Sequence, residues 1–188
     1  MDKAYPGNVR QMAANEVGRL LDIKRFVHGL ERLHGGILVG TFRSEGSNGI
    51  MRTINKIVIH HTATSAYTSV DSIRDYHMNE LGWRDIGYHY IINSDGMLRL
   101  GRPDWMIGAH VKGQNRDSIG VAVIGNFEDY TFLAAGKWLT PQGRMLPTVL
   151  ADLMHRYPAA EVVTHREIAA TLCPGVNLQN WVEKKWGK

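Results

Sequence analysis

The only cysteine in this chain, Cys173, follows His165 by eight residues. Thiolate and imidazole are among the best zinc ligands in proteins, and a catalytic zinc takes three protein ligands and keeps a fourth position for water. A further ligand is available upstream, where the apolar, β-branched run Ile57–Ile59 ends in His60 and His61. Two histidines and the cysteine around one ion indicate a hydrolytic metal site.

Neighbouring residues on a strand point to opposite faces of the sheet. At most one of His60 and His61 therefore reaches the metal easily, and the spacing leaves open which one. The same alternation applies to Tyr88 and His89, of which one faces the cleft and the other lies behind it. A histidine taken alone is more often a hydrogen-bonded structural residue than a ligand, so the hypothesis depends on several of them converging.

Cys173 has two rival interpretations. A free cysteine often packs as a small buried hydrophobic residue, and paired with a histidine it would be the nucleophile of a cysteine peptidase. A zinc hydrolase loses activity to a chelator and resists a thiol alkylator while the metal is bound. A thiol enzyme shows the reverse behaviour.

The composition is that of a globular protein, with 188 residues, of which 44% are hydrophobic. The formal charge of +4 is only weak evidence for a polyanionic partner. The basic residues are scattered along the chain, which is typical of a solvated surface. We therefore expect no nucleic-acid partner. A single cysteine excludes an internal disulfide.

No apolar run reaches the length of about 18 residues that a membrane span needs. The opening stretch Met1–Arg10 lacks the apolar core of a secretory signal. We expect no transmembrane segment and a protein that first resides in a cytoplasm.

Hydrophobic periodicity predicts one α/β (α+β) domain with a central mixed β-sheet flanked by helices. A hairpin turn at Asn93–Gly96 is expected to join the predicted strands 87–93 and 97–101, because Asp-Gly supplies the positive backbone angles of a tight turn. Pro147 is expected to confine regular helical geometry to the later part of the helix that follows Pro141. The predicted strands are 56–61, 87–93, 97–101, 118–124 and 161–164, and the predicted helices are 70–81, about 141–157 and 178–186.

The first fifty residues have a different pattern. Apolar positions at helical spacing between Val9 and Leu30, followed by a polar, glycine-containing stretch, predict a helical extension and linker over 1–50 and a catalytic domain over 51–188. Two interpretations of this extension stay open: it would pack on the domain as an extra helix, or its basic residues would draw the protein to an anionic envelope.

Five motifs follow one another in the order Ile57–Thr64, Gly82–Ile92, Gly108–Asn115, Ser118–Val121 and His165 through Cys173-Pro174. In this order they resemble the type 2 family of zinc-dependent N-acetylmuramoyl-L-alanine amidases, which includes phage lysozymes of amidase type and peptidoglycan recognition proteins. The likeness spans about residues 54 to 186.

The resemblance implies site residues one by one. It implies that His60, His165 and Cys173 bind Zn²⁺, and that the Tyr88 hydroxyl lies beside the water that attacks the amide. Thr171 falls where phage members have lysine and animal recognition proteins commonly have threonine, so the oxyanion would depend more on zinc and Tyr88. The loop Gly108–Asn115 resembles the family's cleft wall, which makes His110 and Asn115 candidate substrate contacts. The proton that the leaving amine needs could come from Tyr88, from the metal-bound water or from a nearby histidine such as His110. His89 is expected in the core.

The function that the resemblance implies is hydrolysis, by a zinc-activated water, of the amide between N-acetylmuramic acid and L-alanine of peptidoglycan. The small size and the phage likeness favour a monomeric endolysin that gathers in the host cytoplasm and then acts on the cell wall. The alternative is a peptidoglycan-binding module of the same fold that hydrolyses nothing. Some phage members also bind a phage RNA polymerase, which the residues here do not support directly.

Overall fold

The fold is built on a five-stranded mixed sheet with the strand order β3-β2-β4-β1-β5. The structure, a computed structural model, describes residues 52–128 and 140–186. Strand β1 (Lys56–His61) lies between β4 (Ser118–Val123) and β5 (Glu161–Thr164) and is parallel to both. Strand β2 (Tyr90–Ile92) is parallel to β4 and pairs antiparallel with β3 (Leu98–Leu100). This architecture confirms the predicted α/β fold class.

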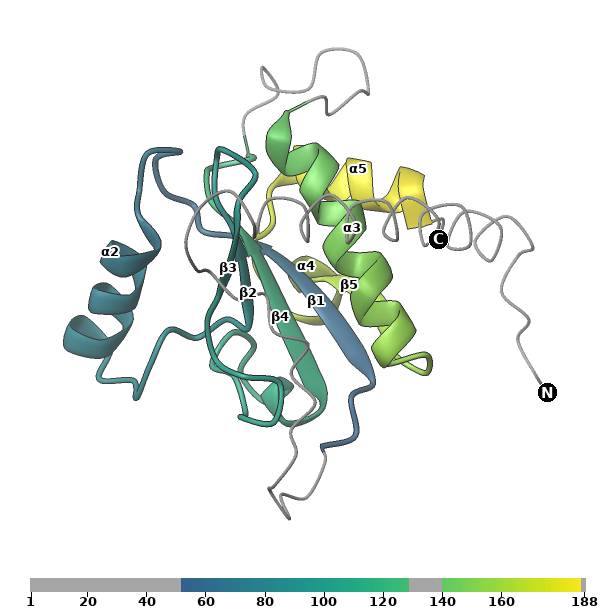
Figure 1. The fold of residues 1–188 in the computed structure, drawn as a ribbon, viewed down its shortest axis with the longest axis horizontal. Coiled ribbons are helices and arrows are strands. Elements are labelled where there is room, and N and C mark those ends of the chain that lie inside the picture. The colour runs from purple at the N-terminus through teal and green to yellow at the C-terminus, as the bar shows by residue number, and fades with distance from the viewer. Residues whose placement is uncertain (1–51, 129–139, 187–188) are drawn as a thin grey trace, which may run out of the picture. The chain divides into compact units, whose positions relative to one another are not determined.

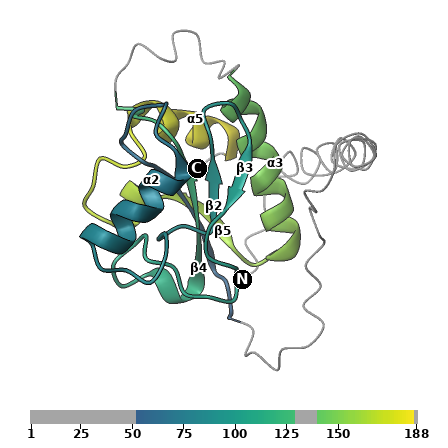
Figure 2. The same ribbon diagram turned by 60° about the vertical axis from the view of Figure 1, so that its left-hand side comes forward.

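Helices cover both faces of the sheet (Figure 1). Helices α3 (Pro141–Arg156) and α5 (Val176–Trp186) pack on one face, and α2 (Val70–Asp75) lies on the other side, as the rotated view also shows (Figure 2). Helix α2 continues into a π-helical turn, η1 (Tyr76–Glu80). Two short elements complete the fold, namely the 3₁₀ turn η2 (Asn115–Asp117) and helix α4 (His165–Ile168).

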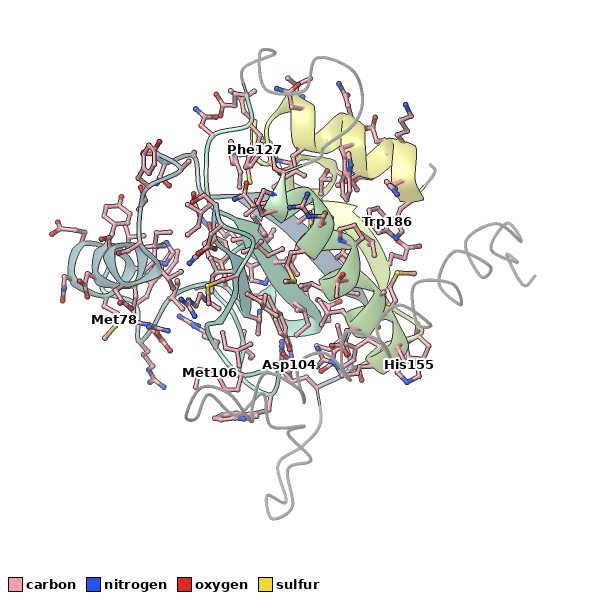
Figure 3. The ribbon with its side chains drawn as sticks, turned by 45° about the horizontal axis from the view of Figure 1, so that its top comes forward. Met78, Asp104, Met106, Phe127, His155 and Trp186 are labelled. Carbon is pink, nitrogen blue, oxygen red and sulfur yellow. The ribbon has the colours of Figure 1, made fainter. Side chains whose placement is uncertain are left out.

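The main core lies between the sheet and helices α3 and α5. Alternate residues of β1 and β4 point into it, as the period of two in a strand requires. Figure 3 shows Phe127 where α5 begins and Trp186 at its end, and both belong to or pack on this core. Its fully buried side chains include Ile57, Ile59, Ile92, Ile119, Val121, Val123, Leu146, Leu150 and Leu153.

The opposite face of the sheet is covered less evenly. A second cluster joins Val70 and Ile73 of α2 to Ile91 of β2. A third joins Val58 of β1 to Val163 of β5. On this side of the sheet the rings of four histidines also lie together, with centroids 5.1 Å apart for His60 and His110, 4.6 Å for His60 and His165, and 5.6 Å for His89 and His110. We call this the polar face of the sheet.

Most of the predicted elements are confirmed, with shifts at their ends. Strand β2 covers only the last part of the predicted 87–93, and helix α5 begins two residues before the predicted start at Leu178. The expectation that Pro147 restricts α3 to its later part is wrong, because the helix is continuous from Pro141. The predicted extension at 1–50 and its boundary with the catalytic domain lie outside the described residues.

Candidate metal centre

Two neighbouring parallel strands deliver His60 and His165 to the same place. Residues Ile59 of β1 and Thr164 of β5 are partners in the strand register. His60 follows Ile59 within β1, and His165 follows Thr164 as the first residue of α4. Adjacent strands lie about 4.8 Å apart. The imidazole centroids are accordingly 4.6 Å apart. The carboxyl ends of parallel strands are the usual place for a site in such a sheet.

A capping box fixes the backbone at His165. The Glu167 carboxylate accepts a hydrogen bond from the Thr164 backbone N–H at 2.5 Å and from its hydroxyl at 2.9 Å. These bonds satisfy polar groups that the start of helix α4 would otherwise leave unpaired. The turn from strand β5 into α4 therefore has a defined geometry, and His165 lies at that turn.

The loop after α4 brings Cys173 to the two histidines. The Thr171 hydroxyl accepts a hydrogen bond from the Cys173 backbone N–H at 3.2 Å, and the Gly175 N–H donates to Leu172 O at 2.7 Å. Gly175 has a φ of +84°, and a Cβ at this position would lie 2.3 Å from the backbone carbon of Phe127. Only glycine fits both the angle and the close approach.

The three predicted ligands form one cluster. Their ligand atoms all lie within 4.8 Å of one another, and the Cys173 sulfur is 3.6 Å from Nδ1 of His60. Two ligands on a tetrahedral zinc, with bonds of about 2.3 Å to sulfur and about 2.0–2.1 Å to nitrogen, lie roughly 3.6 Å apart. The donor types and this separation therefore fit zinc.

Burial holds the cluster in its uncharged form. It lowers the pKa of His165, and it lowers the pKa of His60 well below the usual range, with His110 nearby adding to the effect. Burial also raises the pKa of the Cys173 thiol to about 12. Neutral imidazoles are what a metal needs, whereas the thiol ionises only beside a cation. A thiol nucleophile would need the opposite pKa shift.

Tyr88 lies next to the cluster. Its ring centroid is 5.3 Å from that of His60 and 5.6 Å from that of His77. Burial raises the pKa of the phenol, and the nearby Cys173 adds to this. The hydroxyl therefore stays protonated and is a hydrogen-bond donor at neutral pH.

The two predicted substrate contacts are engaged within the protein. The His110 side chain is only 8% exposed and places its two ring nitrogens near His60 and Ser118. The Asn115 side-chain oxygen accepts hydrogen bonds at 2.8 Å from the backbone N–H groups of His110 and Val111. Their substrate contacts stay predictions, and a contact by Asn115 would use its amide nitrogen.

The rings of His61 and His89 lie away from the ligand cluster, as the alternation of side chains along a strand predicts. His61 lies on the face opposite His60, where its Nδ1 accepts a hydrogen bond from the Phe127 backbone N–H at 3.2 Å. His89 is fully buried, and its Nδ1 accepts from the Gly120 N–H at 3.0 Å. Neither ring belongs to the ligand cluster.

Two arginines that the sequence did not single out hold the loops around the cluster. Each donates to several backbone carbonyls, a pattern that no sequence motif marks. Arg52 donates to the carbonyls of Asp104, Asn115 and Arg116, and Arg102 donates to those of Asp85, Ile86 and Ile107. Figure 3 shows Asp104 near the end of α3, where its carboxylate also accepts hydrogen bonds from Arg156 and Tyr157.

Comparison with known proteins identifies relatives. The family model described as N-acetylmuramoyl-L-alanine amidase matches residues 51–176. The endolysin of Escherichia phage T7 is 39% identical over 131 residues, which is 68% of this chain and 85% of the relative. Peptidoglycan-recognition protein SC2 of Drosophila melanogaster is 35% identical over 136 residues, 65% of this chain and 69% of the relative.

A solved structure shares the fold. The Ph2119 endolysin from Thermus scotoductus MAT2119 bacteriophage Ph2119 is similar with a TM-score of 0.64 and 32% sequence identity, covering 80% of this chain and 93% of that chain. The family match covers well over half of the chain and includes all three clustered ligand residues. The chain belongs to the N-acetylmuramoyl-L-alanine amidase family.

Proposed function

We propose that this protein is a peptidoglycan hydrolase of endolysin type that cleaves the amide bond between N-acetylmuramic acid and the L-alanine of the stem peptide. The observation that carries the proposal is the cluster of His60, His165 and Cys173 beside the Tyr88 ring. The endolysin relative from phage T7 and the family match support the same activity.

Zinc is the cofactor that the donor set favours, with His60, His165 and Cys173 as its ligands. When bound, zinc supplies Lewis acidity, which lowers the pKa of water from about 15.7 to about 7 and polarises an amide carbonyl. An amide is a poor electrophile and water a poor nucleophile, so this chemistry meets both needs. The neutral imidazoles and the sheltered thiol are the protein's contribution to holding the ion.

Tyr88 stabilises the negative charge that develops on the carbonyl oxygen of the scissile amide. Its raised pKa makes the phenol a weak acid but a persistent hydrogen-bond donor. One such donor is worth about 10²- to 10³-fold in kcat. The Thr171 hydroxyl, which accepts from the Cys173 N–H, keeps its own proton to donate to the same oxygen. A threonine brings no positive charge, so its effect is the smaller one.

The activity is tested on purified cell walls of several chemotypes. Turbidity loss and release of stem peptides with a free L-alanine amino group are expected, with loss of both after chelation and recovery on adding zinc. The variant His165→Ala should be inactive, whereas His155→Ala, at an exposed histidine on α3, should be fully active. Absence of peptide release from every wall type, with zinc shown to be bound, would reject the proposal.

A second candidate is a peptidoglycan-binding module without catalysis. The 35% identity to a Drosophila peptidoglycan-recognition protein favours it. Cys173 and Tyr88, whose loss would be expected in a module that only binds, are both present. Wall binding without peptide release by the zinc-loaded protein would establish this candidate over hydrolysis.

The cellular setting follows from the likeness to phage endolysins. We propose that the protein acts as a monomer on the host cell wall after gathering in the host cytoplasm. The described residues contain no helix long and apolar enough to cross a membrane. Light scattering tests the monomer, and a pull-down with phage and host polymerase subunits tests the polymerase binding that the resemblance to phage members suggests.

A further inference from the structure

A line of polar contacts leads away from the ligand cluster into the protein. Nε2 of His60 lies 3.1 Å from Nδ1 of His110. Nε2 of His110 lies 3.4 Å from the Ser118 hydroxyl, which is long for a hydrogen bond, and that hydroxyl donates to the Gln114 carbonyl at 2.6 Å. His60, His110 and Ser118 are all buried. The line therefore starts at a predicted ligand and ends on the backbone carbonyl of Gln114.

The His110 ring is held in a slot between two glycines. A Cβ on Gly108 would lie 2.6 Å from Cδ2 of His110, and a Cβ on Gly120 would lie 2.7 Å from its Cδ2 and Cγ. Real Cβ atoms do not come this close to another atom, so both positions need glycine for the ring to stay where it is. The main chain at His110 is fixed as well, because its N–H donates to the Asn115 side chain.

The contacts allow one consistent placement of protons. Nδ1 of His60 faces the Cys173 sulfur, so a metal would take this nitrogen and the ring would carry its proton on Nε2. That N–H then donates to Nδ1 of His110, which places the His110 proton on Nε2, facing Ser118. The Ser118 proton is already committed to the Gln114 carbonyl. With this placement every hydrogen bond of the line runs in the same direction, from His60 through His110 and Ser118 to the Gln114 carbonyl, which only accepts.

We propose that His110 is a positioning residue which, anchored through Ser118 to the Gln114 carbonyl, fixes the tautomer and ring orientation of His60 so that Nδ1 is presented to the metal. The proposal rests on the proposed zinc site. Partners of this kind hold a metal-binding histidine in place, and their loss typically costs about 10- to 100-fold in metal affinity. The positioning role proposed for His110 is distinct from the substrate contact that the resemblance implies for this residue.

Zinc affinity, measured by competition with a chelator, tests this role without reference to activity. His110→Phe keeps a ring in the slot but accepts no hydrogen bond, and should weaken zinc binding about 10- to 100-fold. His110→Asn offers an oxygen near the position of Nδ1 and should restore most of the affinity. His155→Phe, the same change at an exposed histidine, should have no effect.

The protonation of the rings gives a second readout. Nitrogen-detected NMR of the zinc-loaded wild type should show His60 and His110 both protonated on Nε2. Unchanged zinc affinity in His110→Phe, with or without a raised KM, or a His60 ring protonated on Nδ1, would overturn the positioning role. A wild type that binds no zinc at all would instead reject the proposed zinc site, so the two failures are distinguishable.

Discussion

Tyr88 and Cys173 are half-buried neighbours, and burial raises the pKa of both groups, with different consequences for each. For Tyr88 the raised pKa is useful, because a neutral phenol donates a hydrogen bond throughout the physiological range. For Cys173 a pKa of about 12 means that the sulfur is a good ligand only once a cation offsets the cost of ionising it. In the proposed mechanism the Cys173 sulfur therefore binds the metal, and the Tyr88 phenol donates to the substrate.

The variant Tyr88→Phe tests this division. We expect kcat for amide hydrolysis to fall by about 10²-fold, the usual effect of losing one oxyanion donor, with zinc affinity unchanged. Steady-state kinetics on a muramyl peptide, with metal analysis of the same sample, measures both quantities.

Tyr90→Phe is the matched control for that variant. Tyr90 donates its hydroxyl to Asp104 at 2.7 Å, a contact outside the ligand cluster. Its removal should lower the stability of the fold by about 1 kcal/mol and leave kcat nearly unchanged. Equal kcat in Tyr88→Phe and wild type would remove Tyr88 from the mechanism.

At this scale the sequence predicted the cluster but not its surroundings. Strand alternation showed that His60 and His61 face opposite ways, and only the family resemblance chose between them. The roles of Ser118 and Gly120 depend on how β4 lies against the His110 loop, which is a long-range contact. No local pattern marks such a contact, so these residues were missed.

At the scale of elements, helix α3 shows tertiary packing overriding a local rule. Pro147 lies within the helix, where it removes one backbone hydrogen bond and its ring crowds the preceding turn. The helix continues because Leu146, Leu150 and Leu153 are completely buried against the sheet. Helix propensity is a weak preference that burial of a whole apolar face outweighs.

Replacing this proline should therefore stabilise the protein. Pro147→Ala restores a backbone donor and a good helix former, and we expect the free energy of unfolding to rise by roughly 2 kcal/mol. Urea titration at fixed pH measures it. Pro141→Ala is the control, since Pro141 is in the first turn, where a missing N–H costs nothing, and no gain is expected there. An equal gain at both positions would refute this explanation.

The turn η1 was not predictable from periodicity. The sequence indicated a regular helix over 70–81, but the Leu81 N–H donates to Tyr76 O, five residues back, at 3.2 Å. This wider turn accompanies a contact in which Nδ1 of His77 accepts from the Gly87 N–H at 3.1 Å. The residue that His77 contacts, Gly87, lies outside the helix, so the spacing of apolar residues within the helix could not predict this turn.

At the scale of the whole molecule, the polar face of the sheet makes stability depend on pH. Burial lowers the pKa of His89 to about 4, and it also lowers the pKa of both His60 and His110 well below the usual range. In the unfolded chain a histidine has a pKa of about 6.5. The folded protein thus holds these rings neutral at pH values where the unfolded chain binds protons.

The metal-free protein should therefore lose stability as the pH falls from about 6.5 toward 4. Because the folded pKa is depressed, the stabilisation is complete above the unfolded pKa and is lost as acid protonates the unfolded chain. His89 alone should contribute about 2 kcal/mol of loss between pH 7 and 5. Urea titration at these two pH values, with chelator present, measures the total.

His89→Asn isolates that contribution. The asparagine side chain keeps an acceptor for the Gly120 N–H that His89 binds, but it does not titrate. The variant should be less stable than the wild type at pH 7, because a buried ring is lost, yet should show a shallower decline toward pH 5. Parallel declines in the two proteins would show that His89 does not carry the effect.

Much of the fold could be predicted, because the apolar runs of β1 and β4 and the helical spacing of apolar residues in α5 are local features of the sequence. Periodicity does not predict the strand order, since that order depends on which distant strands pair. The resemblance supplied the site that this order creates, where β1 and β5 bring His60 and His165 together.

The central claim is that one zinc ion is bound by His60, His165 and Cys173 together. X-ray absorption at the zinc edge of the loaded protein tests it most directly. The spectrum should contain one sulfur at about 2.3 Å and light ligands, two of them imidazoles, at about 2.0–2.1 Å, and Cys173→Ser should lose the sulfur. A wild-type spectrum with only nitrogen and oxygen around the zinc would contradict the account.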